Sequence, residues 1–179
     1  EIGLSVGVPQ ELARLDISMD EARAINEETM DILDSALPAG RIDHSGPHFS
    51  YRDVRVLPPV VQRVRPPVWA TIVSEGSARK AAQRGYKIST GFHDRAKIRS
   101  IFDAYREEAR GAGFSDGPDN LAIRRRVIVS DSREQASELA AQVAERYRQF
   151  TINDSRMKLS AVPDDTSGKG GFSLSEDEF

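Results

Sequence analysis

The sequence predicts an α/β protein with a parallel sheet, and two observations support this fold class. First, four segments of strand length are each followed by an amphipathic segment of helix length, and such pairs favour parallel strands joined by right-handed crossovers. Second, residues 68–73 are largely apolar, which is typical of a strand covered on both faces. The length of 179 residues fits one domain or part of one.

We expect the strands at residues 2–8, 68–73, 86–90 and 123–129. These runs are short and rich in Val, Ile, Thr and aromatic residues, and Gly, Pro or Ser lies at most of their ends.

The helices are predicted from start signals and apolar spacing. Ser18 with Glu21, and Ser132 with Gln135, have the spacing of capping boxes, and Ser74 precedes the alanine-rich segment as a third N-cap candidate. We expect three helices to end at Pro38, Gly85 and Gly111. The predicted inner faces are Ala22, Ile25, Thr29, Ile32, Leu33 and Ala36; Ala78, Ala81 and Ala82; Ile98, Ile101, Phe102, Tyr105 and Ala109; and Ala136, Leu139, Ala140, Val143 and Tyr147.

Two segments do not follow the strand-helix pattern. Residues 41–65 carry Gly and Pro around a short hairpin, and we interpret them as an irregular insertion or linker. Residues 151–179 are polar, and we expect a mobile insertion or a truncated C-terminal segment. Residues 1–150 are expected to form one domain. Because strand-like residues begin almost at Glu1, we expect the chain to be a piece of a longer protein.

Composition limits the partners that we expect. A net charge of −3 gives no general electrostatic reason to bind nucleic acid, and there is no apolar run of ~20 residues that would predict a membrane span. The sequence has no cysteine, which excludes disulfides and thiolate chemistry and suits the cytoplasmic location that we expect. His44 and His48 have the spacing of a helical metal pair, but Gly46 and Pro47 lie between them. We therefore expect exposed loop histidines and no metal site.

Ligands in parallel α/β proteins bind at the carboxyl ends of the strands, so the loops at 7–11, 74–77, 90–93 and 130–133 are the informative ones. The loop at 74–77 combines two hydroxyls and a glycine with a helix start. If Ser74 caps that helix, the amides of Gly76 and Ser77 become free donors for a phosphate. The carboxylate of Glu75 would repel a phosphate, so we assign this residue a backbone role only. An ordinary helix cap explains the same residues.

Three further candidates follow the third strand. Thr90 and Gly91 are placed where they could line the edge of a ligand, and His93 could face it as a catalytic group. The competing interpretation for His93 is a loop residue beside the next helix.

Five segments occur in an order and spacing that resemble the luciferase-like flavin-dependent monooxygenase family, the group that includes bacterial luciferase and alkanesulfonate monooxygenase. They are VGVPQELARLDI, EETMDIL, GPHFSYRDVRVLPPVVQRVRPPVW, SEGSARKAAQRG and VIVSDSREQA. The resemblance implies a (β/α)₈ TIM barrel, a fold that needs ~250 residues. Residues 1–150 would then be part of its catalytic domain, with about four βα units corresponding to family strands 4 to 7.

The resemblance also implies a function. Family members use reduced FMN, supplied by a separate NAD(P)H-dependent flavin reductase, and O₂ to oxygenate a small organic substrate. Ser74 and Ser77 fall on the hydroxyl positions of the phosphate loop, with Glu75 and Gly76 between them, and Ser5 stands where some relatives have an arginine. Two alternatives stay open, an F420-dependent oxidoreductase and a non-catalytic flavin-binding barrel. Family members commonly form dimers or higher oligomers.

Overall fold

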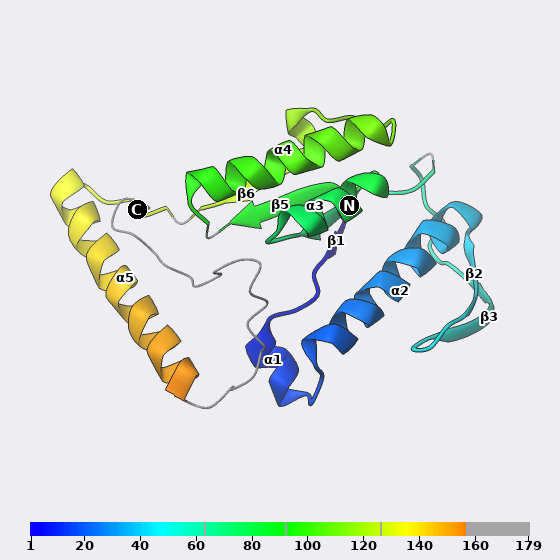
Figure 1. The fold of residues 1–179 in the computed structure, drawn as a ribbon, viewed down its shortest axis with the longest axis horizontal. Helices are drawn as coiled ribbons and strands as arrows, with labels where there is room; N and C mark the ends of the chain where they lie inside the picture. The colour runs from blue at the N-terminus through cyan, green and yellow to red at the C-terminus, as the bar shows by residue number, and fades with distance from the viewer. Residues whose placement is uncertain (63, 92, 126, 157–179) are drawn as a thin grey trace.

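The structure is a computed structural model that describes residues 1–62, 64–91, 93–125 and 127–156. Its centre is a parallel sheet with strand order β1-β4-β5-β6 (Figure 1). The strands are β1 (Ile2–Leu4), β4 (Val68–Thr71), β5 (Lys87–Gly91) and β6 (Leu121–Arg124). The predicted fold class is therefore confirmed, and the carboxyl ends of these strands lie along one edge of the sheet.

The strand boundaries differ from the predicted ones. We expected the last strand at residues 123–129, but β6 ends at Arg124, and Val127 and Val129 are 79% and 87% exposed. This prediction was wrong because pairing with β5, and not the apolar run, decides where β6 lies: Leu121 is opposite Ile88. β1 and β4 are also shorter than expected. The last paired residue of β1 is Leu4, opposite Ala70, and the last paired residue of β4 is Thr71, opposite Ser89.

The helices follow their local signals closely. They are α1 (Pro9–Arg14), α2 (Met19–Ala39), α3 (Glu75–Gln83), α4 (Arg95–Gly111) and α5 (Arg133–Arg156), with a short 3₁₀ helix at Pro118–Asn120. Ser18 Oγ accepts from Glu21 N at 3.1 Å, and Ser132 Oγ accepts from Gln135 N at 3.1 Å, so both predicted caps are confirmed. α1 was not expected. α2 continues through Pro38 and ends at Gly40, whose φ of 67° is the left-handed conformation typical of a helix end.

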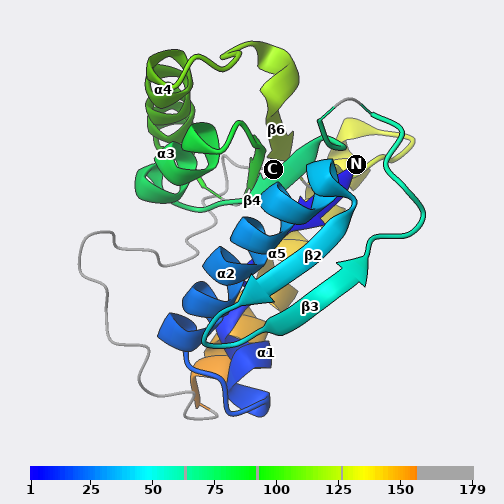
Figure 2. The ribbon, with the colours of Figure 1, turned by 90° about the vertical axis from the view of Figure 1, so that its right-hand side faces the viewer.

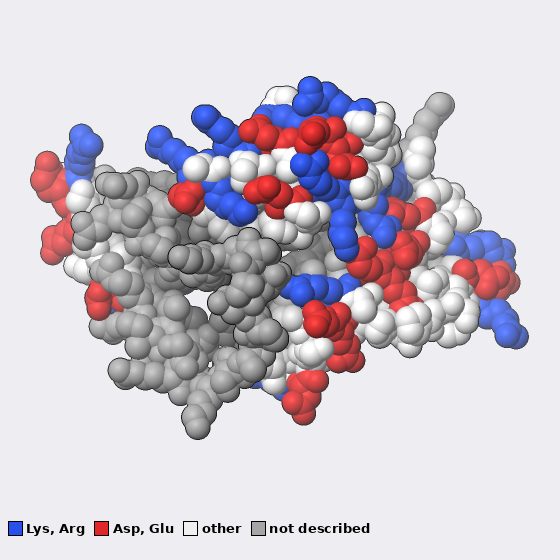
Figure 3. All heavy atoms as spheres, in the orientation of Figure 1, with Lys and Arg blue, Asp and Glu red and all other residues white. Residues whose placement is uncertain are grey.

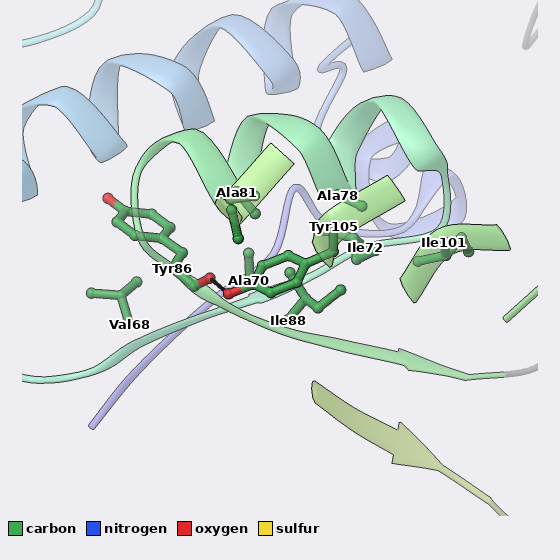
Figure 4. Close-up of a cluster of buried hydrophobic side chains, with 11 residues drawn as sticks. Val68, Ala70, Ile72, Ala78, Ala81, Tyr86, Ile88, Ile101 and Tyr105 are labelled. Carbon is green, nitrogen blue, oxygen red and sulfur yellow. Dashed lines mark hydrogen bonds between the residues drawn. The ribbon is translucent and has the colours of Figure 1, made fainter. Parts of the chain in front are cut away.

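The core lies between the sheet and the two helices α3 and α4, which cover one of its faces (Figure 4). It consists of Val68, Ala70, Ile72, Ala78, Ala81, Ala82, Tyr86, Ile88, Ile101, Tyr105 and Ala109. The alanines of α3 let this helix approach the strands closely, as their narrow face predicted. The buried Tyr105 hydroxyl donates to the Tyr86 carbonyl at 2.9 Å and so ties α4 to the start of β5.

The predicted inner face of α5 is not buried like that of the other helices. Leu139 and Val143 are 39% and 38% exposed, and Figure 1 shows α5 away from the sheet. The Tyr147 side chain and residues 157–179 lie outside the described residues. The predicted boundary between residues 150 and 151 falls inside α5.

Charged side chains join α2 to α3. Arg84, at the end of α3, bonds Asp31 at 2.7 Å and Asp34 at 2.8 Å, and the Tyr86 hydroxyl donates to Asp34 at 2.9 Å. Burial and the bond to Asp34 raise the pKa of Tyr86, so the hydroxyl keeps its proton. Blue and red side chains are interspersed over the described part of the face shown in Figure 3.

Residues 41–65 contain the expected hairpin, formed by β2 (Arg41–Ser45) and β3 (Ser50–Arg55). Figure 2 shows the hairpin running beside α2, and in Figure 1 α2 separates it from the central sheet. The hairpin is therefore part of the outer layer and not of the sheet.

A buried carboxylate on α2 holds the hairpin turn. Glu28 Oε1 bonds His44 Nε2 at 2.8 Å and accepts from Phe49 N, while Oε2 bonds His48 Nδ1 at 2.6 Å and accepts from His48 N. A Cβ on Gly46 would lie 2.0 Å from Oε1, so only glycine leaves room for the carboxylate. The prediction of exposed loop histidines was wrong for His44, which lies in β2 and is half-buried. His48 lies in the turn and is exposed as a residue, although its imidazole is partly covered where it bonds Glu28. Burial would raise the pKa of Glu28, but these hydrogen bonds together lower it to about 2.

Candidate functional site

The loop after β4 forms the predicted helix cap at the carboxyl edge of the sheet. Ser74 Oγ accepts from Ser77 N at 3.2 Å, and the hydroxyls of Ser74 and Ser77 lie 3.0 Å apart. Both hydroxyls therefore lie at the N-terminus of α3, as expected. The Ser77 amide is bonded to Ser74, so our expectation that it would be a free donor was wrong.

Among the described residues, the amides without a hydrogen-bond partner at this helix start lie one residue earlier than expected. In any α-helix the first amides lack an acceptor within the helix, and the cap contact satisfies only that of Ser77. The amides of Glu75 and Gly76 remain at the positive end of α3. A Cβ built on Gly76 would meet no atom within 4 Å, so the backbone is open on that side. This geometry fits a phosphate group.

The Glu75 side chain is directed to α4. Its Oε1 accepts from Ser100 Oγ at 2.9 Å and from Lys97 Nζ at 3.2 Å. These contacts lower the pKa of Glu75, with the bond to Ser100 as the largest cause and that to Lys97 next. Glu75 is thus ionised at neutral pH, and its charge is paired with a lysine of the neighbouring helix.

Strand register decides which face each candidate occupies. Paired and alternate residues point to the same side, so Thr90 shares the core-facing side with Ile88 and Ala70, while Ser89 shares the opposite side with Trp69. Thr90 is 2% exposed, and its Oγ1 has no hydrogen-bond partner among the described residues. This placement favours packing against the helices, and a role for Thr90 at a ligand stays a prediction.

Gly91 has a structural reason to be glycine. An added Cβ would lie 2.8 Å from the Arg124 carbonyl oxygen and 3.1 Å from the Arg124 Cβ on β6. Close approach of β5 and β6 thus accounts for this residue without a ligand. His93 is half-buried in the loop after β5, on the same edge as Ser74, and Arg125 Nη1 donates to its carbonyl at 3.2 Å.

A shallow hollow that our sequence analysis missed lies on the sheet face opposite α3 and α4. It has a volume of about 420 Å³ and is lined by Glu1, Ile2, Gly3, Trp69, Ser89 and Ala122. The Trp69 indole donates to Glu1 at 3.2 Å, and Lys87 Nζ lies 5.2 Å from the ring centroid. Side chains alternate between the two faces of a strand, so following this alternation from Trp69 along the sequence would have indicated the sheet face on which the hollow lies. None of the predicted site residues lines the hollow.

The described residues hold neither a metal-binding cluster nor a membrane-spanning helix. They contain no group of three or more His, Cys, Asp or Glu side chains that could hold a metal ion. None of the helices in the same residues combines the length and apolar character needed to cross a membrane.

The chain is similar to two curated proteins from Sinorhizobium fredii. Uncharacterized protein y4wF is 30% identical over 149 residues, which make up 82% of this chain and 43% of the relative. Uncharacterized protein y4vJ is 27% identical over 134 residues, or 73% of this chain and 38% of the relative. The chain thus spans about two fifths of the length of the curated relatives that it matches.

Solved structures share the fold. The monooxygenase RslO1 from Streptomyces bottropensis matches with a TM-score of 0.75 and 22% identity, over 86% of this chain and 48% of the other. The oxygenating constituent of 3,6-diketocamphane monooxygenase from Pseudomonas putida, a type II Baeyer-Villiger monooxygenase in complex with FMN, matches with a TM-score of 0.66 and 16% identity, over 84% and 46%. These matches confirm the predicted partial TIM barrel.

Residues 1–174 match the sequence profile of the family described as luciferase-like monooxygenase. The match covers nearly the whole chain and agrees with the resemblance that five sequence segments predicted. The chain therefore belongs to the luciferase-like monooxygenase family.

Proposed function

We propose that the protein containing this chain is a monooxygenase that uses reduced FMN and O₂ to oxygenate a small organic substrate, and that the N-terminus of α3 binds the FMN phosphate. Family membership supports the reaction class, and a solved neighbour was determined with FMN. The reductase that would supply FMN, the substrate and a homo-oligomeric assembly belong to the same proposal.

The observation that carries the proposal is the geometry of the loop 74–77. Two neighbouring hydroxyls, the amides of Glu75 and Gly76, and the open side of Gly76 converge at one helix end. A charge-assisted hydrogen bond contributes about 1.5–3 kcal/mol, and the helix dipole adds about 0.3–1 kcal/mol. Two or three such contacts would anchor a phosphate. Bound reduced flavin would supply the activation of O₂, while these residues would hold its phosphate in place.

A second candidate is an F420-dependent oxidoreductase. It is considered because Ser5 stands where some relatives have an arginine at the FMN phosphate, so that this chain lacks one FMN contact of those relatives. The Ser5 hydroxyl instead accepts from Gly7 N at 3.4 Å. The loop 74–77 would bind the phosphate of either cofactor. Titration of the whole protein with each reduced cofactor, with and without O₂, separates these two functions. A barrel that binds flavin without turnover on any substrate is the third outcome.

The test of the phosphate site compares FMN with riboflavin, which lacks the phosphate. In the full-length protein, Ser74→Ala should raise the dissociation constant of FMN about tenfold, since ~1.4 kcal/mol corresponds to a factor of ten. Riboflavin binding should scarcely change. Equal losses for the two ligands would contradict the proposal.

Because Ser74 also caps α3, the variant needs a control for the lost cap, which is itself worth about 0.5–2 kcal/mol. Ser18→Ala is matched, since Ser18 makes the same contact at the start of α2. It should lower stability similarly and leave FMN affinity unchanged. Ser74→Asp keeps a capping side chain and adds a negative charge, so it should lower FMN affinity with little loss of stability.

A further inference from the structure

Glu75 presents a difficulty for the proposed phosphate site. It is the first residue of α3 and lies between Ser74 and Gly76, so its own carboxylate could occupy or repel an anion at the helix end. A negative side chain is favourable at a helix N-terminus, which makes Glu75 a competitor for any external anion. The site requires something that keeps this carboxylate away.

Two residues of α4 supply that restraint. Lys97 and Ser100 are three residues apart on one face of α4, and both contact Glu75 Oε1. The Ser100 hydroxyl also lies 2.9 Å from the Lys97 carbonyl oxygen. The Ser100 hydroxyl can donate its one proton to only one of these two acceptors at a time and carries no charge, so the Lys97 ammonium is the group that balances the charge of Glu75.

The restraint is anchored in the loop after β5. Asp94 caps α4 by accepting from Lys97 N at 2.7 Å, so the backbone of Lys97 is fixed while its side chain crosses to α3. The contact therefore joins the two loops that follow β4 and β5 at the same edge of the sheet.

We propose that Lys97, assisted by Ser100, is a positioning residue for the phosphate site: it holds the Glu75 carboxylate against α4 and neutralises it, which leaves the N-terminus of α3 open to an anion. This inference rests on the proposed function. It assigns Lys97 no contact with the phosphate itself, and this distinction makes the inference testable.

The experiment uses the full-length protein and measures dissociation constants of FMN and riboflavin by flavin fluorescence. Lys97→Met keeps the length of the side chain and removes its charge. It should weaken FMN binding by roughly three- to tenfold and leave riboflavin binding within about twofold. The double variant Lys97→Met with Glu75→Gln should restore FMN binding, because the unbalanced carboxylate is gone.

A matched control is Lys80→Met. Lys80 lies on α3 and pairs with Glu27 at 2.6 Å, so its removal changes the net charge and deletes an ion pair without touching Glu75. FMN binding should stay within about twofold of the wild type, since exposed ion pairs contribute little.

The outcomes separate the two proposals. If Lys97→Met leaves FMN binding unchanged while Ser74→Asp weakens it selectively, the positioning role is wrong and the phosphate site stands. If Glu75→Gln fails to rescue Lys97→Met, the lysine contacts the phosphate directly and the positioning role is again overturned. If Ser74→Asp affects FMN and riboflavin alike, the phosphate site itself is wrong.

Discussion

The substitution Gly91→Ala tests whether strand packing or a ligand explains this glycine. The added Cβ would lie 2.8 Å from the Arg124 carbonyl oxygen, a backbone atom that cannot rotate away as a side chain can. Overpacking of this kind costs about 1–3 kcal/mol, and the lower entropy of the unfolded alanine chain returns about 0.4–1 kcal/mol. The net loss of stability should be about 1–2 kcal/mol.

Urea unfolding of the cofactor-free full-length protein, followed by circular dichroism, measures this loss. With a urea m-value of ~3 kcal/mol per molar, the unfolding midpoint should fall by roughly 0.3–0.7 M. An unchanged midpoint would show that β5 and β6 can separate without cost and would refute the reasoning. A ligand-lining role for Gly91 predicts the opposite pattern, in which the midpoint is kept and flavin affinity is lost.

Gly76→Ala is the matched comparison. Its Cβ would meet no atom within 4 Å, and alanine is favoured over glycine in a helix by up to about 1 kcal/mol. The unfolding midpoint should therefore stay the same or rise. FMN affinity should fall, because the methyl group would occupy the open side of the backbone where we propose that the phosphate binds. A lower midpoint for this variant would contradict the open geometry at the start of α3.

Two further predictions concern other parts of the structure. Burial raises the pKa of Glu28, but its hydrogen bonds lower it by more, so the pKa falls from the ordinary 4.5 to about 2. The contribution of Glu28 to the stability of the folded state is therefore complete above pH 4.5 and is lost as the pH falls towards 2. The protection of the amides of His48 and Phe49 against hydrogen exchange, taken relative to unstructured amides at the same pH, should fall over this range, and Glu28→Gln should show low protection at every pH. Equal protection in both proteins would exclude the role of Glu28. Tyr105→Phe removes the 2.9 Å hydrogen bond to the Tyr86 carbonyl and should lower the free energy of unfolding in urea by about 1–2 kcal/mol. An unchanged unfolding midpoint would show that this hydrogen bond does not stabilise the fold.

Features set by neighbouring residues were predictable from the sequence. The caps at Ser18, Ser74 and Ser132 each involve an amide three residues along the chain, and all three form as expected. The parallel sheet was predictable as well, because the order of strands and helices permits few topologies. The arrangement of the loop 74–77, which we propose binds a phosphate, belongs to this group because its residues are contiguous.

Features set by distant residues were not predictable in this way. The position of β6 depends on its pairing with β5, which no apolar run encodes, and the exposed Val127 and Val129 misled the strand prediction. Glu28 lies among other acidic residues of α2, and its partners lie 16 to 21 residues further on in the hairpin. The sequence signal that could have found this contact is Gly46, where a side chain would meet the carboxylate.

The proposed cofactor site likewise has one part that is set by residues close together in the sequence and one part that is set by distant residues. The phosphate loop and its support on α4 lie between residues 74 and 100, so two successive βα units suffice to build them. The opposite sheet face, with Trp69, Lys87 and Ser89, draws its side chains from several strands, and ring and substrate contacts in a barrel are likewise shared among many strand ends. Substitutions at the N-terminus of α3 should therefore change affinity for the phosphate, whereas selectivity for the ring and the substrate should depend on strands beyond these units. Comparing FMN with riboflavin tests the first part without requiring the second.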